Sequence, residues 1–323
     1  LVCVQDVHPD QIGDKYTEWG NSALAGGNYD DAHRYYGKAY NLGLEESRHR
    51  ALVEKVTEAE EAAALPPALI EMVRIPAGTF SMGSPIGESD RDIDEGPVHQ
   101  VTITKDFLLG TSEVTQVQWK AVIGSNPSHF NTYGNLHPVE EVSWLDAVKF
   151  CNKLSEHEGL APAFRIYSEN VTWIRGVNGY RLPTESEWEY ACRAGTTTPF
   201  SFGGAISTDQ ANYDGNYPYG GEKRGEYRHT TTPARTFPAN AWGLYDMHGN
   251  VWEWCWDWLD EGYYSKSSST DPTGSEWRGS SRVRRGGGFS EKAHLLRSAN
   301  RAGGNPSDHY MILGFRVARS LEE

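Results

Sequence analysis

The stretch Asn240-Ala-Trp-Gly-Leu-Tyr-Asp-Met-His-Gly-Asn-Val-Trp-Glu-Trp254 decides the fold class of this 323-residue chain. It is dense in glycine, asparagine and aromatic residues, and so is most of the chain after Thr196. Glycine and asparagine allow tight turns, whereas tryptophan and tyrosine bury a large area and keep one polar atom that needs a partner. With 34 Gly, 16 Pro, 11 Trp and 17 Tyr, the composition indicates short strands joined by long loops and not a helical bundle.

Two helices are predicted upstream of this stretch. Ser143 followed by Asp146 begins an apolar periodic run that ends at Gly159. A capping box at Thr184 predicts a second helix, which ends at Gly195. We predict a strand and turn over residues 72–80 and a strand over residues 98–103, where apolar and polar residues alternate.

The N-terminal part of the chain has a different pattern. Residues 11–64 show helical periodicity in three stretches, the first of which is broken at Gly26-Gly27. The two stretches on either side of Gly27-Asn28-Tyr29 resemble a single tetratricopeptide repeat. One such repeat cannot bury its apolar face alone, so we expect it to pack on the larger domain or on a partner. We place the boundary after Pro66-Pro67. The chain then divides into a helical segment (1–67), a large domain (68–319) and a candidate tag remnant (320–323).

The charge of the chain excludes one class of partner. The formal net charge is −14. Because an acidic protein repels phosphate backbones, we expect no nucleic-acid partner. Residues 274–319 are an exception, with nine Lys and Arg against three Asp and Glu, and we interpret these arginines as donors to carbonyls and carboxylates inside loops. No apolar run of about 18 residues predicts a transmembrane segment.

The four cysteines do not form a C-x-x-C pair and are too few for a disulfide scaffold. Cys151, Cys192 and Cys255 lie among apolar or aromatic neighbours, and we predict buried thiols. Cys3 follows Leu1-Val2 in a chain without an initiator Met, so a lipid anchor at Cys3 or upstream is one interpretation and an arbitrary chain start is the other. The first interpretation predicts an extracytoplasmic, cell-surface lipoprotein.

Several long motifs resemble the formylglycine-generating-enzyme (sulfatase-modifying factor) family over about residues 68–319. The resemblance implies an α+β domain with a C-type lectin fold of the formylglycine-generating-enzyme type and much irregular structure, here preceded by a short N-terminal α-helical segment. The motifs occur in the family's order and are Ile75-Pro-Ala-Gly-Thr-Phe-Ser-Met-Gly83, Ser112-Glu-Val-Thr115, Pro138-Val-Glu-Glu-Val-Ser-Trp144, Tyr180-Arg-Leu-Pro-Thr-Glu-Ser-Glu-Trp-Glu-Tyr190, the stretch 240–254, Arg285-Gly-Gly287 and Leu313-Gly-Phe-Arg-Val317.

Two branches of this family are enzymes, and each can be checked in this chain at the residues that its chemistry requires. The oxidase members carry two copper-binding redox cysteines after the Arg-Gly-Gly motif, but residues 288–297 contain no cysteine. The iron-dependent sulfoxide-forming members need a histidine cluster on the helical segment. His8, His33 and His49 lack the i, i+4 spacing that would place two on one helix face. We therefore predict that the chain is not an enzyme.

The C-terminal stretch resembles a narrower group, the variable proteins of diversity-generating retroelements. The shared residues are Arg285-Gly-Gly-Gly-Phe289, Arg297-Ser-Ala-Asn-Arg301, Asn305-Pro306 and Gly314-Phe-Arg316. The resemblance implies that residues between these motifs, within about 285–316, are diversified to bind a ligand. The candidate positions are Ser290, Glu291, Lys292, His294, Leu295, Ala302, Gly303, Gly304, Asp308, Tyr310, Met311 and Ile312.

These twelve side chains are chemically mixed and follow neither a helical nor a strand period. Such a set suits a surface patch, and a cluster of Leu295, Tyr310, Met311 and Ile312 is an apolar patch of the kind that marks binding sites. An ordinary mobile loop is the alternative. We assign Arg285, Arg297, Arg301 and Arg316 to the scaffold, where a planar guanidinium can bridge several oxygens.

Metal binding is the least determined feature. Asn250, Val251 and Glu253 match a family position that holds calcium through oxygen ligands, and the alternative is that Asn250 bonds a turn and Glu253 pairs with an arginine. No cofactor is required beyond this candidate structural calcium. The acidic run at residues 90–96 departs from a calcium loop in the position of its glycine, so we predict a solvated loop.

Three functions remain at this point. The first is a non-catalytic protein that displays a diversified site to an unknown protein or surface ligand. The second is an interaction or regulatory module of the same fold with a fixed partner. The third, an oxidase, lacks the cysteines that its chemistry needs.

Overall fold

The computed structural model describes residues 12–25, 29–41, 43–63, 70–276 and 278–321. The chain divides into two compact units, Leu1–Leu69 and Ile70–Glu323. The predicted boundary between residues 67 and 68 lies two residues from this division. The Pro66-Pro67 pair, the Gly26-Gly27 break, Cys3 and His8 all lie outside the described residues.

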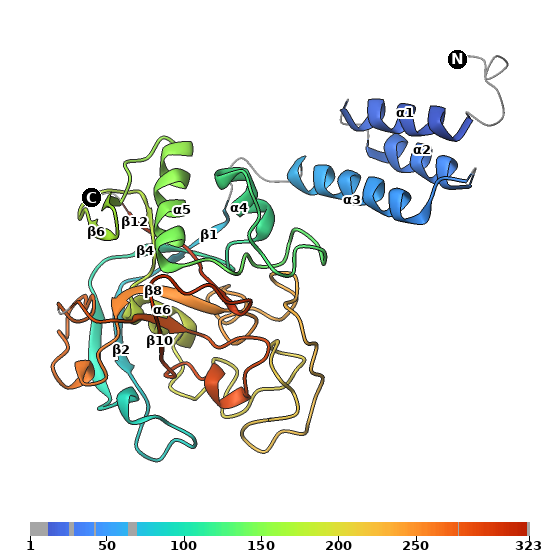
Figure 1. The fold of residues 1–323 in the computed structure, drawn as a ribbon. Helices are drawn as coiled ribbons and strands as arrows, with labels where there is room; N and C mark the ends of the chain where they lie inside the picture. Colours follow the sequence, from blue (N-terminus) through green and yellow to red (C-terminus); the bar gives the residue numbers. More distant parts are fainter. Residues whose placement is uncertain (1–11, 26–28, 42, 64–69, 277, 322–323) are drawn as a thin grey trace. The chain divides into compact units, whose positions relative to one another are not determined.

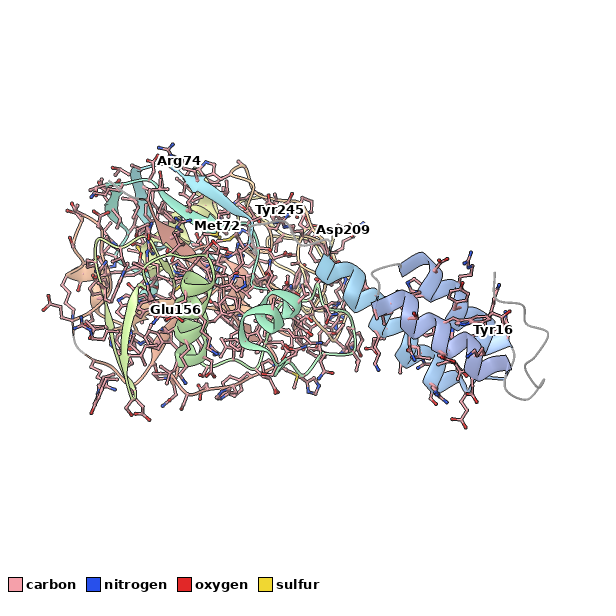
Figure 2. All side chains as sticks on the ribbon, turned by 90° about the horizontal axis from the view of Figure 1, so that it is seen from above. Tyr16, Met72, Arg74, Glu156, Asp209 and Tyr245 are labelled. Carbon is pink, nitrogen blue, oxygen red and sulfur yellow. The ribbon has the colours of Figure 1, made fainter. Side chains whose placement is uncertain are left out.

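The described part of the first unit contains three helices, α1 (Ile12–Ala25), α2 (Tyr29–Asn41) and α3 (Glu46–Ala63), as the periodicity predicts (Figure 1). Ala32 and Tyr36 of α2 form its core with Leu52 and Val56 of α3. The ring of Tyr36 lies so close to Gly20 that a Cβ there would be 2.2 Å from the ring. Only glycine allows this approach of α1 to α2. Tyr16, labelled in Figure 2, lies beside the rings of Trp19 and Tyr35 on these helices. Packing of this unit on another surface stays a prediction.

The second unit, called the lectin domain below, has three helices among its described residues. The helices are α4 (Gln116–Ile123), α5 (Trp144–His157) and α6 (Glu185–Arg193), and the 3-10 turns are η3 (Ile93–Glu95), η4 (Tyr263–Ser265) and η5 (Ala293–Leu296). Capping boxes begin α5 at Ser143 and α6 at Thr184, as predicted. The left-handed residue that ends α6 is Ala194, one residue before the predicted Gly195. Helix α4 was not predicted from the sequence, although Thr115 and Gln118 form the same kind of box.

Two four-stranded sheets and two hairpins complete the domain (Figure 1). The first sheet has the order β1 (Met72–Ile75), β4 (Phe107–Gly110), β12 (Ala318–Ser320), β7 (Tyr180–Arg181). The second has the order β10 (Ala302–Gly304), β9 (Arg282–Arg285), β8 (Trp252–Trp258), β11 (Leu313–Gly314). The hairpins are β2 (Gly78–Met82) with β3 (His99–Ile103), and β5 (Phe164–Tyr167) with β6 (Asn170–Trp173). The predicted α+β class is confirmed.

The C-terminal end of the described chain is part of the first sheet. Ser320 pairs with Phe107 in β12, and Arg181 donates a hydrogen bond to its hydroxyl (3.2 Å). Strand β12 therefore includes Ser320, one residue beyond the predicted end of the domain at 319. Among the described residues, no helix combines the length and hydropathy that crossing a membrane requires.

Candidate ligand-binding surface

The strand β8 has two faces of opposite character. Trp252, Trp254, Trp256 and Trp258 alternate with Glu253, Cys255 and Asp257, so the four indoles point to one side of the sheet. Trp252 and Trp254 are at most 2% exposed, whereas Trp256 and Trp258 are half-buried. The other side carries Glu253, whose carboxylate binds the scaffold residue Arg316. The alternation forms an aromatic floor on the first side, where Trp252 and Trp254 lie next to Glu291 and Gly304 of the C-terminal segment.

The neighbouring strand β9 adds arginines to the same floor. Arg284 pairs with Trp254 and Arg282 with Trp258, on either side of an irregularity in the ladder. The Arg282 guanidinium lies 3.6 Å from the ring centre of Trp258 and donates a hydrogen bond to the carbonyl of Trp256 (2.5 Å). The Arg284 guanidinium lies 5.0 Å from the ring centre of Trp252. Both arginines therefore form cation–π contacts with the indole row.

The motif arginines lie beneath this floor and are buried. Arg285 donates to the carbonyls of Ala299 (2.8 Å) and Asn300 (2.5 Å) and pairs with Glu189, while Arg301 binds both oxygens of Glu185 (2.8 and 2.7 Å). The prediction that these arginines belong to the scaffold is confirmed. Because one guanidinium bridges several segments, replacing it would leave several buried oxygens without donors.

The contacts of Arg297 show that the loop at residues 90–96, predicted to be solvated, is buried at one position. Glu95 is completely buried and binds Arg297 through both carboxylate oxygens (2.7 and 2.6 Å). Burial is the largest single effect and raises the pKa of Glu95, but the hydrogen bonds and charge of Arg297, with the hydrogen bond from Ser84, together outweigh it and lower the pKa below its usual value. Asp90 and Asp92 are exposed, as a solvated loop requires. The run is therefore solvated except at Glu95, the carboxylate that binds the scaffold residue Arg297.

The twelve predicted ligand positions lie mostly at the surface. Tyr310 (47% exposed) and Met311 (42%) are the most exposed large apolar side chains among them, and Gly304 alone is buried. The flanking motif arginines are buried throughout. The exposed or half-buried positions are Ser290, Glu291, Lys292, His294, Leu295, Ala302, Gly303, Asp308, Tyr310, Met311 and Ile312.

One group of these positions surrounds the Arg284–Trp252 pair. Glu291 accepts a hydrogen bond from the indole nitrogen of Trp252 (3.1 Å). Ala302 pairs with Arg284 across β10 and β9, and the Ile312 carbonyl accepts from the Trp252 backbone (2.7 Å). Burial lowers the pKa of Arg284, and the charges of Glu291, Asp308 and Tyr310 oppose this shift. We call these residues the Arg284 group: Trp252, Arg284, Glu291, Ala302, Asp308, Tyr310 and Ile312.

A second group lies on and before η5. The ammonium of Lys292 is 4.7 Å from the ring centre of Tyr217, which is 51% exposed. His294 and Leu295 are half-buried on η5, between the buried Ala293 and Leu296 that fix the turn to the core. Glu291 and Lys292 are adjacent in sequence and connect the two groups.

Gly304 does not display a side chain. A Cβ at this position would lie 2.6 Å from the Trp254 ring, and the Trp254 indole nitrogen is held by the carbonyl of Val142 (3.0 Å). At Gly303 a Cβ would meet the end of the Leu259 side chain at 2.6 Å, and Leu259 is only half-buried. The two glycines, treated alike from the sequence, are therefore in different environments.

Sequence reasoning missed three residues of this surface, namely Trp252, Arg284 and Tyr217. The period-two tryptophans of residues 252–258 were a usable signal, since such alternation predicts a strand with one aromatic face. Tyr217 carried no comparable signal, because it approaches Lys292 only through the fold.

The described cysteines are unsuited to redox chemistry. Cys151, Cys192 and Cys255 are buried free thiols, as predicted. Burial raises the pKa of Cys192 to about 12 and also raises the pKa of Cys151 and of Cys255. A thiol that stays protonated is a poor nucleophile at neutral pH.

The candidate calcium residues are engaged with protein groups. Both carboxylate oxygens of Glu253 accept from Arg316 (2.6 and 2.5 Å), and one also accepts from the indole nitrogen of Trp188 (2.7 Å). The side-chain oxygen of Asn250 accepts from the backbone nitrogen of Thr232 (2.9 Å). Val251 is buried beside them. This arrangement does not fit calcium at Glu253. Calcium binding through Asn250 and Val251 stays a prediction.

The fold and the surface together define a C-type lectin domain of the formylglycine-generating-enzyme type. Residues 57–321 match the sulfatase-modifying factor enzyme 1-like domain, and the chain belongs to this family. The structure resembles Treponema denticola variable protein 1 with a TM-score of 0.66 and 32% identity, covering 77% of this chain and 95% of that chain. It also resembles PvdO from Pseudomonas aeruginosa, with a TM-score of 0.63, 31% identity and coverage of 78% and 95%.

Curated relatives carry diverse names. The chaperone protein LppX of Paenibacillus barcinonensis is 40% identical over 47% of this chain and 62% of its own length. The serine/threonine-protein kinase pkn1 of Chlamydia caviae is 33% identical over 84% of this chain and 41% of its own length. The formylglycine-generating enzyme of Mus musculus is 28% identical over 78% of this chain and 76% of its own length. The chain thus spans less than two thirds of the first two relatives, and the family contains enzymes.

Proposed function

We propose that the lectin domain is a non-catalytic ligand-binding domain that presents residues 290–312 to a protein or surface ligand. The observation that carries this proposal is the contrast in burial along one segment. Eleven of twelve candidate positions are exposed or half-buried, whereas Arg285, Arg297, Arg301 and Arg316 between and beside them are buried. A rigid frame with a replaceable surface tolerates changes at the ligand face without losing stability.

Diversification of this surface is the finer part of the proposal. It is supported by the motif resemblance to variable proteins and by the similarity to Treponema denticola variable protein 1 over 95% of that chain. The same residues would serve a fixed partner equally well. The genomic sequence distinguishes the two: a reverse transcriptase and a near-repeat of the region encoding residues 285–316 are expected nearby, and their absence would favour the fixed partner.

Absence of catalysis is also a proposal. It is supported by the lack of cysteine in residues 288–297 and by the buried, protonated state of the described thiols. The test is a copper-dependent thiol oxidation assay with a sulfatase-derived peptide, in which we expect no turnover. An extracytoplasmic location with a lipid anchor at or before Cys3 is likewise proposed, and fractionation of the native host checks it.

The binding function is tested by replacing Tyr310 and Met311 with alanine together. Both side chains are about half exposed, so we expect capture of ligand to fall sharply while the melting temperature stays within a few degrees. The measurement is pull-down from cell-surface extract, with calorimetry in parallel. The matched control is Tyr167→Ala, an exposed aromatic (81%) on β5 outside the surface. Unchanged capture, or unfolding of the double variant, would contradict the proposal.

A further inference from the structure

Arg284 differs from the other arginines near it. Arg282 donates to a backbone carbonyl, and Arg285, Arg297, Arg301 and Arg316 each bind carboxylates. Arg284 forms no hydrogen bond or ion pair with any residue that the structure describes, and its buried Nε–H has no acceptor there. Its contact is the face of Trp252 at 5.0 Å. A half-buried guanidinium with unused donors is an unfavourable arrangement unless water or a ligand supplies the acceptor.

The position of Arg284 is central to the predicted surface. It sits between β8 and β10, next to Trp254 on one side and Ala302 on the other. Two carboxylates act on its charge, those of Glu291 and Asp308, but neither forms an ion pair with it. Glu291 accepts from Trp252 (3.1 Å) and Asp308 accepts from the Asn305 backbone (2.8 Å). These acids therefore do not occupy the donors of Arg284. Arg284 itself is not one of the twelve predicted variable positions, whereas the nearby Glu291, Ala302 and Asp308 are.

We propose, on the basis of the ligand-binding function above, that Arg284 is a permanent anchor which donates hydrogen bonds to a planar oxygen acceptor of a protein ligand lying over Trp252. The acceptor is a carboxylate or a main-chain carbonyl, because both present oxygen lone pairs that the guanidinium fork can meet. Tyr310, whose charge acts on Arg284, and the next residue in the chain, Met311, are exposed and would supply apolar contacts. Variable positions would then select the partner, while Arg284 would hold any partner in the same register.

The probe for this inference is a library of random linear peptides displayed on phage and selected on the full chain. Enriched peptides are measured against Arg284→Met, which keeps an apolar cover on Trp252, and Arg284→Lys, which keeps the charge and loses the fork. The matched control is Arg165→Met, an exposed arginine on β5. Loss of a charged hydrogen bond predicts roughly tenfold to hundredfold weaker binding for both Arg284 variants and none for the control.

The melting temperature distinguishes an arginine that binds a ligand from one that the fold requires. Because Arg284 has no acceptor among the described residues, Arg284→Met should melt at or above the temperature of the original chain. A structural arginine would instead lose several degrees on substitution, as expected for Arg285. A clear fall in melting temperature for both Arg284 variants would overturn the inference.

The outcomes distinguish this inference from the proposed function. Peptides that need Tyr310 and Met311 but bind Arg284→Met normally would leave the proposed function standing and refute the anchor. Failure to enrich any peptide over the Tyr310 and Met311 double variant would refute both for peptide ligands. Raising NaCl from about 0.15 M to about 1 M identifies the acceptor, since salt weakens a carboxylate contact and spares a carbonyl contact.

Discussion

Arg316, which follows β11, and Glu253 of β8 form an ion pair with two hydrogen bonds, 2.6 and 2.5 Å long, in the interior of the lectin domain. Arg316 also donates to the carbonyls of Gly110 (3.1 Å) and Tyr245 (3.0 Å), the latter labelled in Figure 2. The pair thereby connects the end of the C-terminal segment 285–316 to both four-stranded sheets. Because both side chains of the pair are hydrogen-bonded, the main cost of removing one of them is the buried, unpaired charge that the other would then carry.

We expect Arg316→Ala to destabilise the domain by about 3–5 kcal/mol, because it leaves the buried Glu253 carboxylate without a counter-charge. Urea unfolding followed by tryptophan fluorescence measures the change. The control is Arg74→Ala, which removes an exposed pair with Asp106 and should cost about 0–1 kcal/mol. Equal costs for the two variants would show that the buried pair does not hold the frame.

Asp257 predicts a pH dependence of stability. Burial, followed by the charge of Glu185, raises the pKa of Asp257 from 3.8 to about 8. Since the folded pKa lies above the unfolded value, its stabilising effect is complete below about pH 4 and is lost as the pH rises through about 8. We expect Asp257→Asn to flatten the profile, gaining on the order of 2 kcal/mol relative to the original chain between about pH 5 and 8.

The measurement is chemical denaturation at intervals of pH, with the exposed Asp209→Asn as control (Asp209 is labelled in Figure 2). Asp257 accepts a hydrogen bond from the Glu185 backbone at 2.8 Å, and the amide oxygen of the Asp257→Asn variant can accept the same bond, so the geometry is kept. Parallel profiles for Asp257→Asn and the original chain would contradict this prediction.

Gly304 and Gly303 should respond differently to alanine. A Cβ at Gly304 meets the fixed ring of Trp254, so we expect Gly304→Ala to cost about 1–3 kcal/mol. Gly303→Ala, which meets the movable end of Leu259 at 2.6 Å and the Cβ of Ser281 at 3.0 Å, should cost less than Gly304→Ala, about 1 kcal/mol. Thermal melts of the two variants check this. If Gly304→Ala is harmless, position 304 is open to diversification after all.

Removal of calcium should leave the melting temperature unchanged, because the Glu253 carboxylate is engaged by Arg316 and Trp188. Differential scanning calorimetry with EGTA, and again with added calcium, measures this. A calcium-dependent rise that Asn250→Ala abolishes would establish the metal site that the sequence suggested.

Local features were predictable because they depend on neighbours in the chain. The caps at Ser143 and Thr184 form hydrogen bonds three residues away, and such bonds follow from residue type and spacing. The position of Glu95 was not predictable in this way. Its partner Arg297 is 202 residues distant, and nothing in the acidic run distinguishes Glu95 from Asp92 or Asp94.

The sequence by itself determined the family, the starts of α5 and α6, the absence of cysteine after Arg285 and the segment in which we propose that a ligand binds. Only the tertiary structure decided which members of that segment reach the surface, that Gly304 does not, and that Arg284 lacks an acceptor among the described residues. The reason is that burial and hydrogen-bond satisfaction depend on which distant segments pack together, and here β8, β9 and β10 bring residues 252, 284 and 302 side by side.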